Sequence, residues 1–185
     1  MTSENNGRIL PALWGYPDQG DDKGEKINTF FAEGSSVATS PTFRMSIRQR
    51  RCLVIADSYY VQRNRGDKKQ VYRVFSRDLP YILLGGIYER RMIHGKDVIC
   101  FNLIQTEANG DILDMYHKMP LIVAEDEMAH WLNGDTPIHD ILDIVRPLKR
   151  YTLQYYQVTN QIMDRSFNHS EAHSRKHEHL TLFDQ

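Results

Sequence analysis

Short apolar runs separated by polar turns dominate the chain, and this pattern predicts many β-strands and few helices. The clearest case is the stretch Arg51–Gln62, RCLVIADSYYVQ, in which Cys52–Ala56 is a continuous run of strand-forming residues. Asp57 and Ser58 end this strand with turn chemistry, and an extended pattern resumes on the aromatic pair Tyr59-Tyr60. A rigid buried strand that leads into an exposed aromatic segment is a favourable position for a functional site, because the strand fixes the exposed side chains in place. Further strands are predicted at 7–13, 70–75, 81–88, 121–123 and 151–158, with an extended or loop-like segment at 27–32 and a hairpin at 93–103 that turns at 94–96.

The predicted helices are short and scattered between the strands. Pro41–Arg50 is predicted as a helix with Ser40 as its N-cap, and two more are predicted at 124–132 and 136–145. The pair Gly85-Gly86 indicates a β-bulge or a close backbone approach. These elements predict one α+β domain built on a curved or barrel-like sheet. We expect a disordered start at 1–6, the domain at 7–163, and a flexible, histidine-rich tail at 164–185.

Composition and charge narrow the function classes. The formal net charge is −1, so any contact with nucleic acid requires a local basic patch. Arg44, Arg48, Arg50 and Arg51 form the most basic short segment, which is either a solvated helix face or a phosphate-contacting patch. Cys52 and Cys100 lie inside apolar runs, which indicates buried thiols and a reducing, cytoplasmic location. No run is long enough to span a membrane, no signal peptide is evident, and no phosphate-binding glycine motif occurs.

Several motifs in a shared order resemble the SOS response-associated peptidase (SRAP) family. RCLVIADSYYVQ is similar to the family signature RCLVPADGFYEW, and Trp14-Gly15 resembles its WG motif. The remaining matches, which together with these cover residues 7 to 160, are FAEGSS at 31–36, QVY at 70–72, GIYE at 86–89, TEAN at 106–109 and MYHKMPLIV at 115–123. The resemblance implies a bifurcated, pseudo-barrel β-sheet with short flanking helices.

The same resemblance implies an activity in the DNA-damage (SOS) response. Members of the family use a cysteine after the initiator methionine to crosslink to abasic sites in single-stranded DNA, supported by an asparagine, a glutamate and a histidine. For this chain the resemblance and the basic segment predict single-stranded DNA as a partner. The predicted DNA contacts are Trp14, Gly15, Arg44, Arg48, Arg51, Thr106 and Lys118.

The chain departs from the family at the chemical positions. Residue 2 is Thr2, and the segment before Trp14 is shorter than in the family, so we expect the family's first strand and helix to be missing. The asparagine, glutamate and histidine positions hold Phe31, Val61 and Tyr116, none of which is suited to acid–base work near neutral pH. Glu33 stands where the family has a phosphate-binding arginine, and Gln62 stands where it has a tryptophan.

These substitutions predict that the crosslinking and peptidase chemistry is lost while DNA binding or scaffolding remains. One alternative is an active enzyme with a rearranged site, for which His117 is the residual catalytic candidate. We expect no cofactor. We also expect no metal site, although His169, His173 and His177 would share a face of a helix.

A second alternative is an interaction module tethered by its C-terminal peptide. The end of the chain reads HLTLF and resembles the QLxLF peptide that binds the bacterial sliding clamp. Leu180, Leu182 and Phe183 would enter an apolar groove of the clamp, on a polar tether.

Overall fold

The computed structural model describes residues 1–4, 8–20, 26–66, 68–147, 150–164 and 166–176. Its largest sheet has the strand order β1-β9-β8-β5, with β4 and β10 also paired to β9. These strands are β1 Leu13–Trp14, β4 Phe31–Glu33, β5 Arg51–Ala56, β8 Ile82–Ile93, β9 Lys96–Glu107 and β10 Lys118–Pro120. β1 and β4 run parallel to β9, whereas the β8, β10 and β5 pairings are antiparallel.

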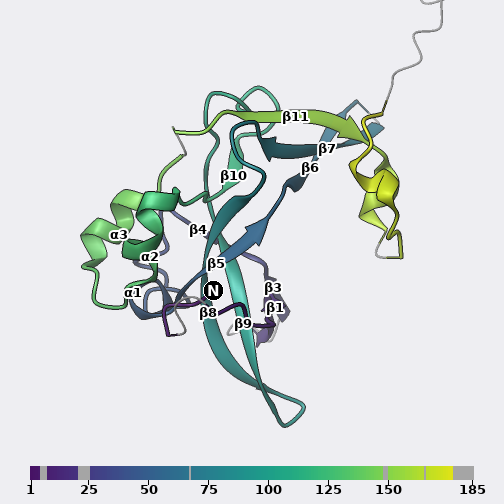
Figure 1. Ribbon diagram of the computed structural model, residues 1–185. Helices are drawn as coiled ribbons and strands as arrows, with labels where there is room; N and C mark the ends of the chain where they lie inside the picture. Colours follow the sequence, from purple (N-terminus) through teal and green to yellow (C-terminus); the bar gives the residue numbers. More distant parts are fainter. Residues whose placement is uncertain (5–7, 21–25, 67, 148–149, 165, 177–185) are drawn as a thin grey trace, which may run out of the picture.

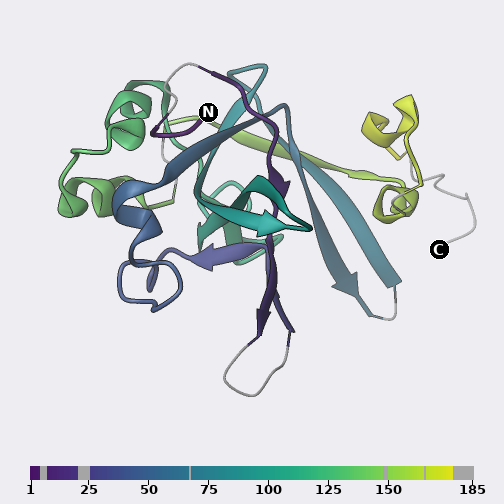
Figure 2. The same cartoon turned by 90° about the horizontal axis from the view of Figure 1, so that it is seen from below.

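Two smaller sheets complete the β-structure. One has the order β11-β7-β6 and consists of β6 Tyr59–Arg65, β7 Lys68–Ser76 and β11 Leu153–Val158. The other is the hairpin of β2 Tyr16–Gly20 and β3 Lys26–Thr29, which projects from the body of the molecule (Figure 2). Within the described residues the pairings form an α+β fold of mixed sheets and do not close into a ring.

The helices are short and lie together on one side of the large sheet (Figure 1). They are α1 Ser46–Gln49, α2 Met128–Leu132 and α3 Ile138–Ile144, with the 3-10 helix η1 Glu125–Glu127 directly before α2. The 3-10 helices η2 Asn160–Met163 and η3 Ser170–His173 follow β11 on the opposite side of the molecule (Figure 1). One buried cluster, with Trp131 and Ile47, lies between the helices and the sheet. A second cluster, with Val61 and Leu84, joins the large sheet to the three-stranded sheet. None of the helices described is long and apolar enough to cross a membrane.

The large sheet splits where β8 and β9 separate, beyond the pair Gly86–Leu103. The segment 118–123 lies between the two strands there, with the Leu121 N–H donating to Ile104 O and the Gly85 N–H donating to Leu121 O. A Cβ on Gly85 would lie 2.6 Å from Leu121 Cδ2, and one on Gly86 would lie 2.7 Å from Asn102 O. The two glycines therefore mark a close approach, and the β5–β8 register shows no bulge.

Several elements differ from the sequence expectation. α1 covers only Ser46–Gln49 of the helix predicted at 41–50, and the carbonyl of Ser40, not its hydroxyl, accepts N–H bonds from Phe43 and Arg44. An isolated helix this short gains too few hydrogen bonds to extend itself through Thr42 and Phe43. The predicted strand 7–13 is reduced to β1, because Pro11 offers no N–H to a ladder.

The first residues lie along β5, although their polar sequence predicts disorder. Thr2 pairs antiparallel with Cys52, the Leu53 N–H donates to Met1 O, and the Ser3 N–H donates to Arg51 O. β5 has a free edge in the sheet order, and backbone hydrogen bonds on such an edge are independent of side-chain polarity.

Candidate functional site

A cavity of about 570 Å³ lies where the large sheet meets the three-stranded sheet. The residues that the sequence singled out as family positions or DNA contacts and that line it together are Trp14, Phe31, Val61, Gln62, Tyr116 and Lys118. They come from β1, β4, β6, the loop before β10, and β10 itself. The positions of the family's asparagine, glutamate and histidine therefore converge in this chain, with apolar and aromatic side chains in their place.

Trp14 is the largest exposed aromatic surface of the cavity. β1 pairs with β9 so that Trp14 stands beside Phe101, and the two rings are parallel within 9° at 6.5 Å. The indole N–H donates to Phe30 O at 2.9 Å, and the ring meets Phe30 and Phe31 edge-on. The indole is thus fixed in orientation while 46% of the residue remains exposed. A fixed, exposed ring of this kind is a platform on which a base or another flat group stacks.

The cavity walls that the structure describes contain no cysteine, histidine or carboxylate. Val61 is buried, and Tyr59 has a buried hydroxyl for which the described residues provide no hydrogen-bond partner. Burial raises the pKa of Tyr59 above its ordinary value, so this phenol stays neutral at physiological pH. Among its described residues the site offers stacking surface and a few polar groups, of which the Lys118 amine and the Ser58 hydroxyl are the ones that chemistry could use, and no thiolate, imidazole or carboxylate to act as nucleophile or general base.

Lys118 is the cation that lines the cavity, and it forms an ion pair with Glu33. Lys118 Nζ lies 2.6 Å from Glu33 Oε2, and the two side chains are 40% and 47% exposed. β4 and β10 both pair with the end of β9, which brings these two residues together. The hydrogen bond to Glu33 raises the pKa of Lys118 above its ordinary value. Glu33 stands where the family has a phosphate-binding arginine, and here it neutralises Lys118, a predicted DNA contact that lines the cavity.

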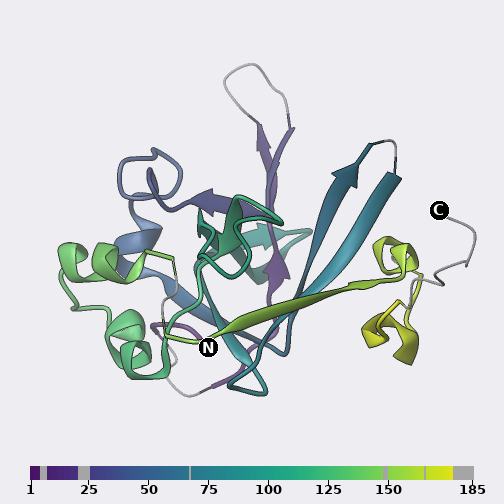
Figure 3. The ribbon, with the colours of Figure 1, turned by 90° about the horizontal axis from the view of Figure 1, so that it is seen from above.

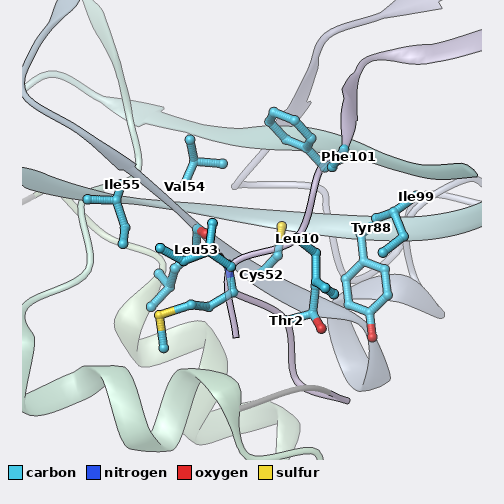
Figure 4. A pocket seen from close by; sticks show the side chains of 12 residues that line it. Thr2, Leu10, Cys52, Leu53, Val54, Ile55, Tyr88, Ile99 and Phe101 are labelled. Carbon is cyan, nitrogen blue, oxygen red and sulfur yellow. Dashed lines mark hydrogen bonds between the residues drawn. The ribbon is translucent and has the colours of Figure 1, made fainter. Parts of the chain in front are cut away.

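A second cavity, of about 390 Å³, lies on the other side of Val54 and Phe101, which line both (Figure 4). It is mostly apolar and brings Thr2, Cys52 and Tyr88 together. Both cysteines of the chain are free and buried. Burial raises the pKa of Cys52 to about 12 and raises that of Cys100 as well. Neither thiol is therefore a reactive thiolate near neutral pH, as the apolar runs around them predict.

Arg51, predicted to contact DNA, lies in the interior. It is 0% exposed, and its guanidinium donates to Trp131 O at 2.7 Å, to Ile47 O at 2.9 Å, and to the carbonyls of Arg48 and Asn133. A side chain surrounded in this way cannot reach a phosphate. Arg51 instead ties the helices to β5, a role that a run of arginines in the sequence does not reveal.

The other predicted DNA contacts are divided over the molecule. The Gly15 N–H already donates to Phe101 O at 2.8 Å, and Thr106 is buried with its hydroxyl on Glu107 O. Arg44 and Arg48 are exposed around α1 and do not line the cavity. His117 is exposed, and it too lies outside the lining of the cavity.

The tail meets the β11-β7-β6 sheet through part of its length. Ala172 is buried, His173 Nδ1 lies 3.6 Å from Asp57 Oδ2, and the Lys176 N–H donates to Gln157 O. Asp57 also accepts from Arg73, which donates to Ser58 and Tyr156. Burial alone would raise the pKa of Asp57, but the Ser58 hydroxyl and the Arg73 charge lower it overall. The predicted clamp-binding residues Leu180, Leu182 and Phe183 lie outside the described residues, as does His177.

Sequence reasoning missed part of the cavity. Phe101 and Gln105 lie on β9, beside the short parallel strands β1 and β4 that bring Trp14 and Phe31 to the cavity. Ile162 and Met163 line it from η2. None of these residues belongs to a motif. The aromatic pair Tyr59-Tyr60 was the available signal, and both tyrosines line the cavity.

Comparisons with known proteins agree with this geometry. Residues 1–165 match the family model described as SOS response associated peptidase (SRAP). The chain is 26% identical over 171 residues to the abasic site processing protein YoaM of Bacillus subtilis, covering 90% of this chain and 75% of that protein. It is 25% identical over 125 residues to the abasic site processing protein YedK of Escherichia coli, covering 68% and 55%. A solved protein from Bacteroides thetaiotaomicron superposes with a TM-score of 0.73 at 26% identity, covering 80% of this chain and 66% of that one.

Proposed function

The chain belongs to the SOS response associated peptidase family, and we propose that it binds single-stranded DNA in the cavity beside Trp14 without crosslinking to it. The relatives are named abasic site processing proteins, which supports a place in the handling of damaged DNA. A protein that binds such strands without covalent chemistry would recognise them or protect them from other proteins. The family match shows the relationship to these proteins, and binding without crosslinking is the role that we propose for this chain.

One observation carries the proposal: the positions that the resemblance assigns to the family's chemistry meet in an aromatic cavity that retains stacking surface and has no thiol, imidazole or carboxylate among its described lining residues. Stacking of a base on an aromatic ring contributes about 1–3 kcal/mol and tolerates any sequence. A strand whose bases are unpaired exposes the faces that such a ring needs, whereas a duplex hides them. An abasic site also removes one base, which lets the neighbouring bases splay toward the ring.

The test uses the full chain with a labelled single-stranded oligonucleotide that carries one abasic site. We expect a salt-sensitive rise in fluorescence anisotropy, and no shifted band after heating in denaturing detergent. A related abasic site processing protein, run in parallel, is the positive control for the adduct. A heat-stable adduct would show that the chemistry survives with rearranged residues. Unchanged anisotropy at low salt would remove the binding function altogether.

Replacing Glu33 with glutamine is expected to tighten binding a few-fold and to steepen its salt dependence. The substitution frees Lys118, which the ion pair at 2.6 Å now neutralises, for a phosphate of the bound strand. Each further phosphate contact on a single strand changes the slope of log K against log salt by about 0.7. Anisotropy titrations over a series of salt concentrations measure both quantities.

Asp97→Asn is the matched control for Glu33→Gln. Asp97 lies 2.7 Å from Arg90 in an exposed ion pair near the turn between β8 and β9, and it does not line the cavity. Equal gains in both variants would assign the effect to net charge alone. No gain in Glu33→Gln would show that Lys118 does not meet a phosphate.

A further inference from the structure

The hairpin of β6 and β7 extends beyond the sheet that supports it (Figure 3). β11 pairs with β7 only as far as Val71, whereas the β6–β7 pairing continues through Arg63–Gln70 and Asn64–Lys69 to Arg65–Lys68. We call these last three residue pairs the arm. From outside the arm, the Asn160 amide donates to Lys69 O at 2.7 Å, and at the base of the arm Gln70 donates to Gln157 Oε1 at 3.5 Å and accepts from the Tyr72 hydroxyl at 3.1 Å. An unsupported two-stranded ribbon is of marginal stability in water, so its composition matters.

The composition of the arm is unfavourable for an isolated ribbon. Arg63, Arg65, Lys68 and Lys69 are exposed, and within the described part of the chain none of them forms an ion pair. Arg65 and Lys68 stand directly opposite each other, and like charges in this position destabilise a strand pair. Asp67 is the only acidic residue in the sequence of the segment 63–69. The net charge of the segment is therefore strongly positive on a protein whose total charge is −1.

The charges continue along β6 from the residues of this strand that line the cavity, Tyr59, Tyr60, Val61 and Gln62. Side chains alternate along a strand, so Val61, Arg63 and Arg65 share one face, and Lys68 joins that face opposite Arg65. Val61 lines the cavity. At about 3.3 Å per residue, Arg63 and Arg65 follow it at about 7 and 13 Å along the strand. Arg63 and Arg65 thus lead away from the cavity along β6 at a spacing that suits an extended strand, and Lys68 stands beside Arg65.

We propose that the arm holds the phosphate backbone of a single strand whose bases lie in the Trp14 cavity. The proposal rests on the proposed function and adds to it the path of the strand outside the cavity. Bound phosphates offset the repulsion between Arg65 and Lys68, so binding orders and stabilises the arm. Aromatic stacking beside a basic track is the combination that sequence-tolerant single-strand binding requires.

The test compares the triple variant Arg63→Gln/Arg65→Gln/Lys68→Gln with the wild-type chain. Strands of about 4 and about 16 nucleotides separate the cavity from the arm, because only the longer one reaches both. For the longer strand we expect an affinity about tenfold lower at low salt. We also expect a salt slope smaller by about 2, as the loss of three phosphate contacts predicts. The shorter strand is expected to bind both proteins alike.

Arg77→Gln/Lys96→Gln is the control, because both residues are exposed and lie on other parts of the sheets. Thermal unfolding verifies that each variant is folded. If the triple variant binds the longer strand with wild-type affinity and slope, the arm is a solvated hairpin and the inference fails while the proposed function stands. If the wild-type chain binds neither strand, the proposed function itself fails. Equal losses in the triple variant and the control would likewise contradict a role specific to the arm.

Discussion

Replacing Arg51 with alanine is expected to lower the free energy of unfolding by about 3–5 kcal/mol. The guanidinium is fully buried and donates to four backbone carbonyls, from Ile47, Arg48, Trp131 and Asn133. The Trp131 indole in turn donates to Cys52 O, which joins α2 to β5. The guanidinium joins α1 to β5 through its bond to Ile47 O. Alanine removes the guanidinium donor from all four carbonyls, of which Asn133 O keeps the Thr136 N–H, and leaves a cavity behind. Because a domain is stable by only about 5–15 kcal/mol, much of this variant is expected to be unfolded or insoluble.

Chemical denaturation of Arg51→Ala, Arg51→Lys and Arg48→Ala measures this effect. Lysine keeps the charge but lacks the planar fork, so an intermediate loss is expected. Arg48 is the matched control: it is exposed, lies in the same basic segment, and its removal is expected to change stability by no more than about 0.5 kcal/mol. A folded Arg51→Ala with unchanged stability and weaker DNA binding would reverse the assignment. It would return Arg51 to the DNA-contacting surface that the sequence predicts.

The basic segment shows where sequence reasoning stops. Arg44, Arg48 and Arg51 are equivalent in the sequence. Only the packing of α1 and α2 buries Arg51 while Arg44 and Arg48 stay exposed. The strand 51–56 and the close approach at Gly85-Gly86 followed from local pattern, because both depend on residues that neighbour each other or on backbone sterics. The length of α1 did not follow, because tertiary contacts decide how many turns of so short a helix persist.

The candidate site was partly predictable for a related reason. Phe31, Val61 and Tyr116 were located by the spacing of motifs, and the structure brings them to one cavity. Phe101 and the Glu33–Lys118 pair depend instead on β1, β4 and β10 all pairing with β9, a topology that no local signal specifies. In the sequence, the arm is a short charged segment that nothing distinguishes from an ordinary hairpin loop. Its significance appears only when the end of β11 shows how far β6 and β7 extend unsupported.

Replacing Trp14 with alanine is expected to weaken binding of single-stranded DNA about 5- to 150-fold, the effect of about 1–3 kcal/mol for one stacked base. The indole is the broadest exposed ring in the cavity, held by the Phe30 carbonyl and by stacking on Phe101. Trp14→Phe keeps a ring on Phe101 and loses only the N–H bond, so a decrease of no more than about threefold is expected. Met92→Ala, which removes a 70% exposed side chain outside the cavity, is the control.

Fluorescence separates a stacking role from a structural one. The chain has two tryptophans, Trp14 half-exposed in the cavity and Trp131 buried against β5. A base stacked on Trp14 quenches its emission, so saturating wild-type protein with DNA is expected to lower the total signal, and Trp14→Phe is expected to abolish the change. Quenching that persists in Trp14→Phe, or wild-type affinity in Trp14→Ala, would place the strand elsewhere. If Trp14→Ala loses affinity while its unfolding midpoint and the emission of Trp131 stay at wild-type values, the lost ring contacted the DNA and did not merely support the fold.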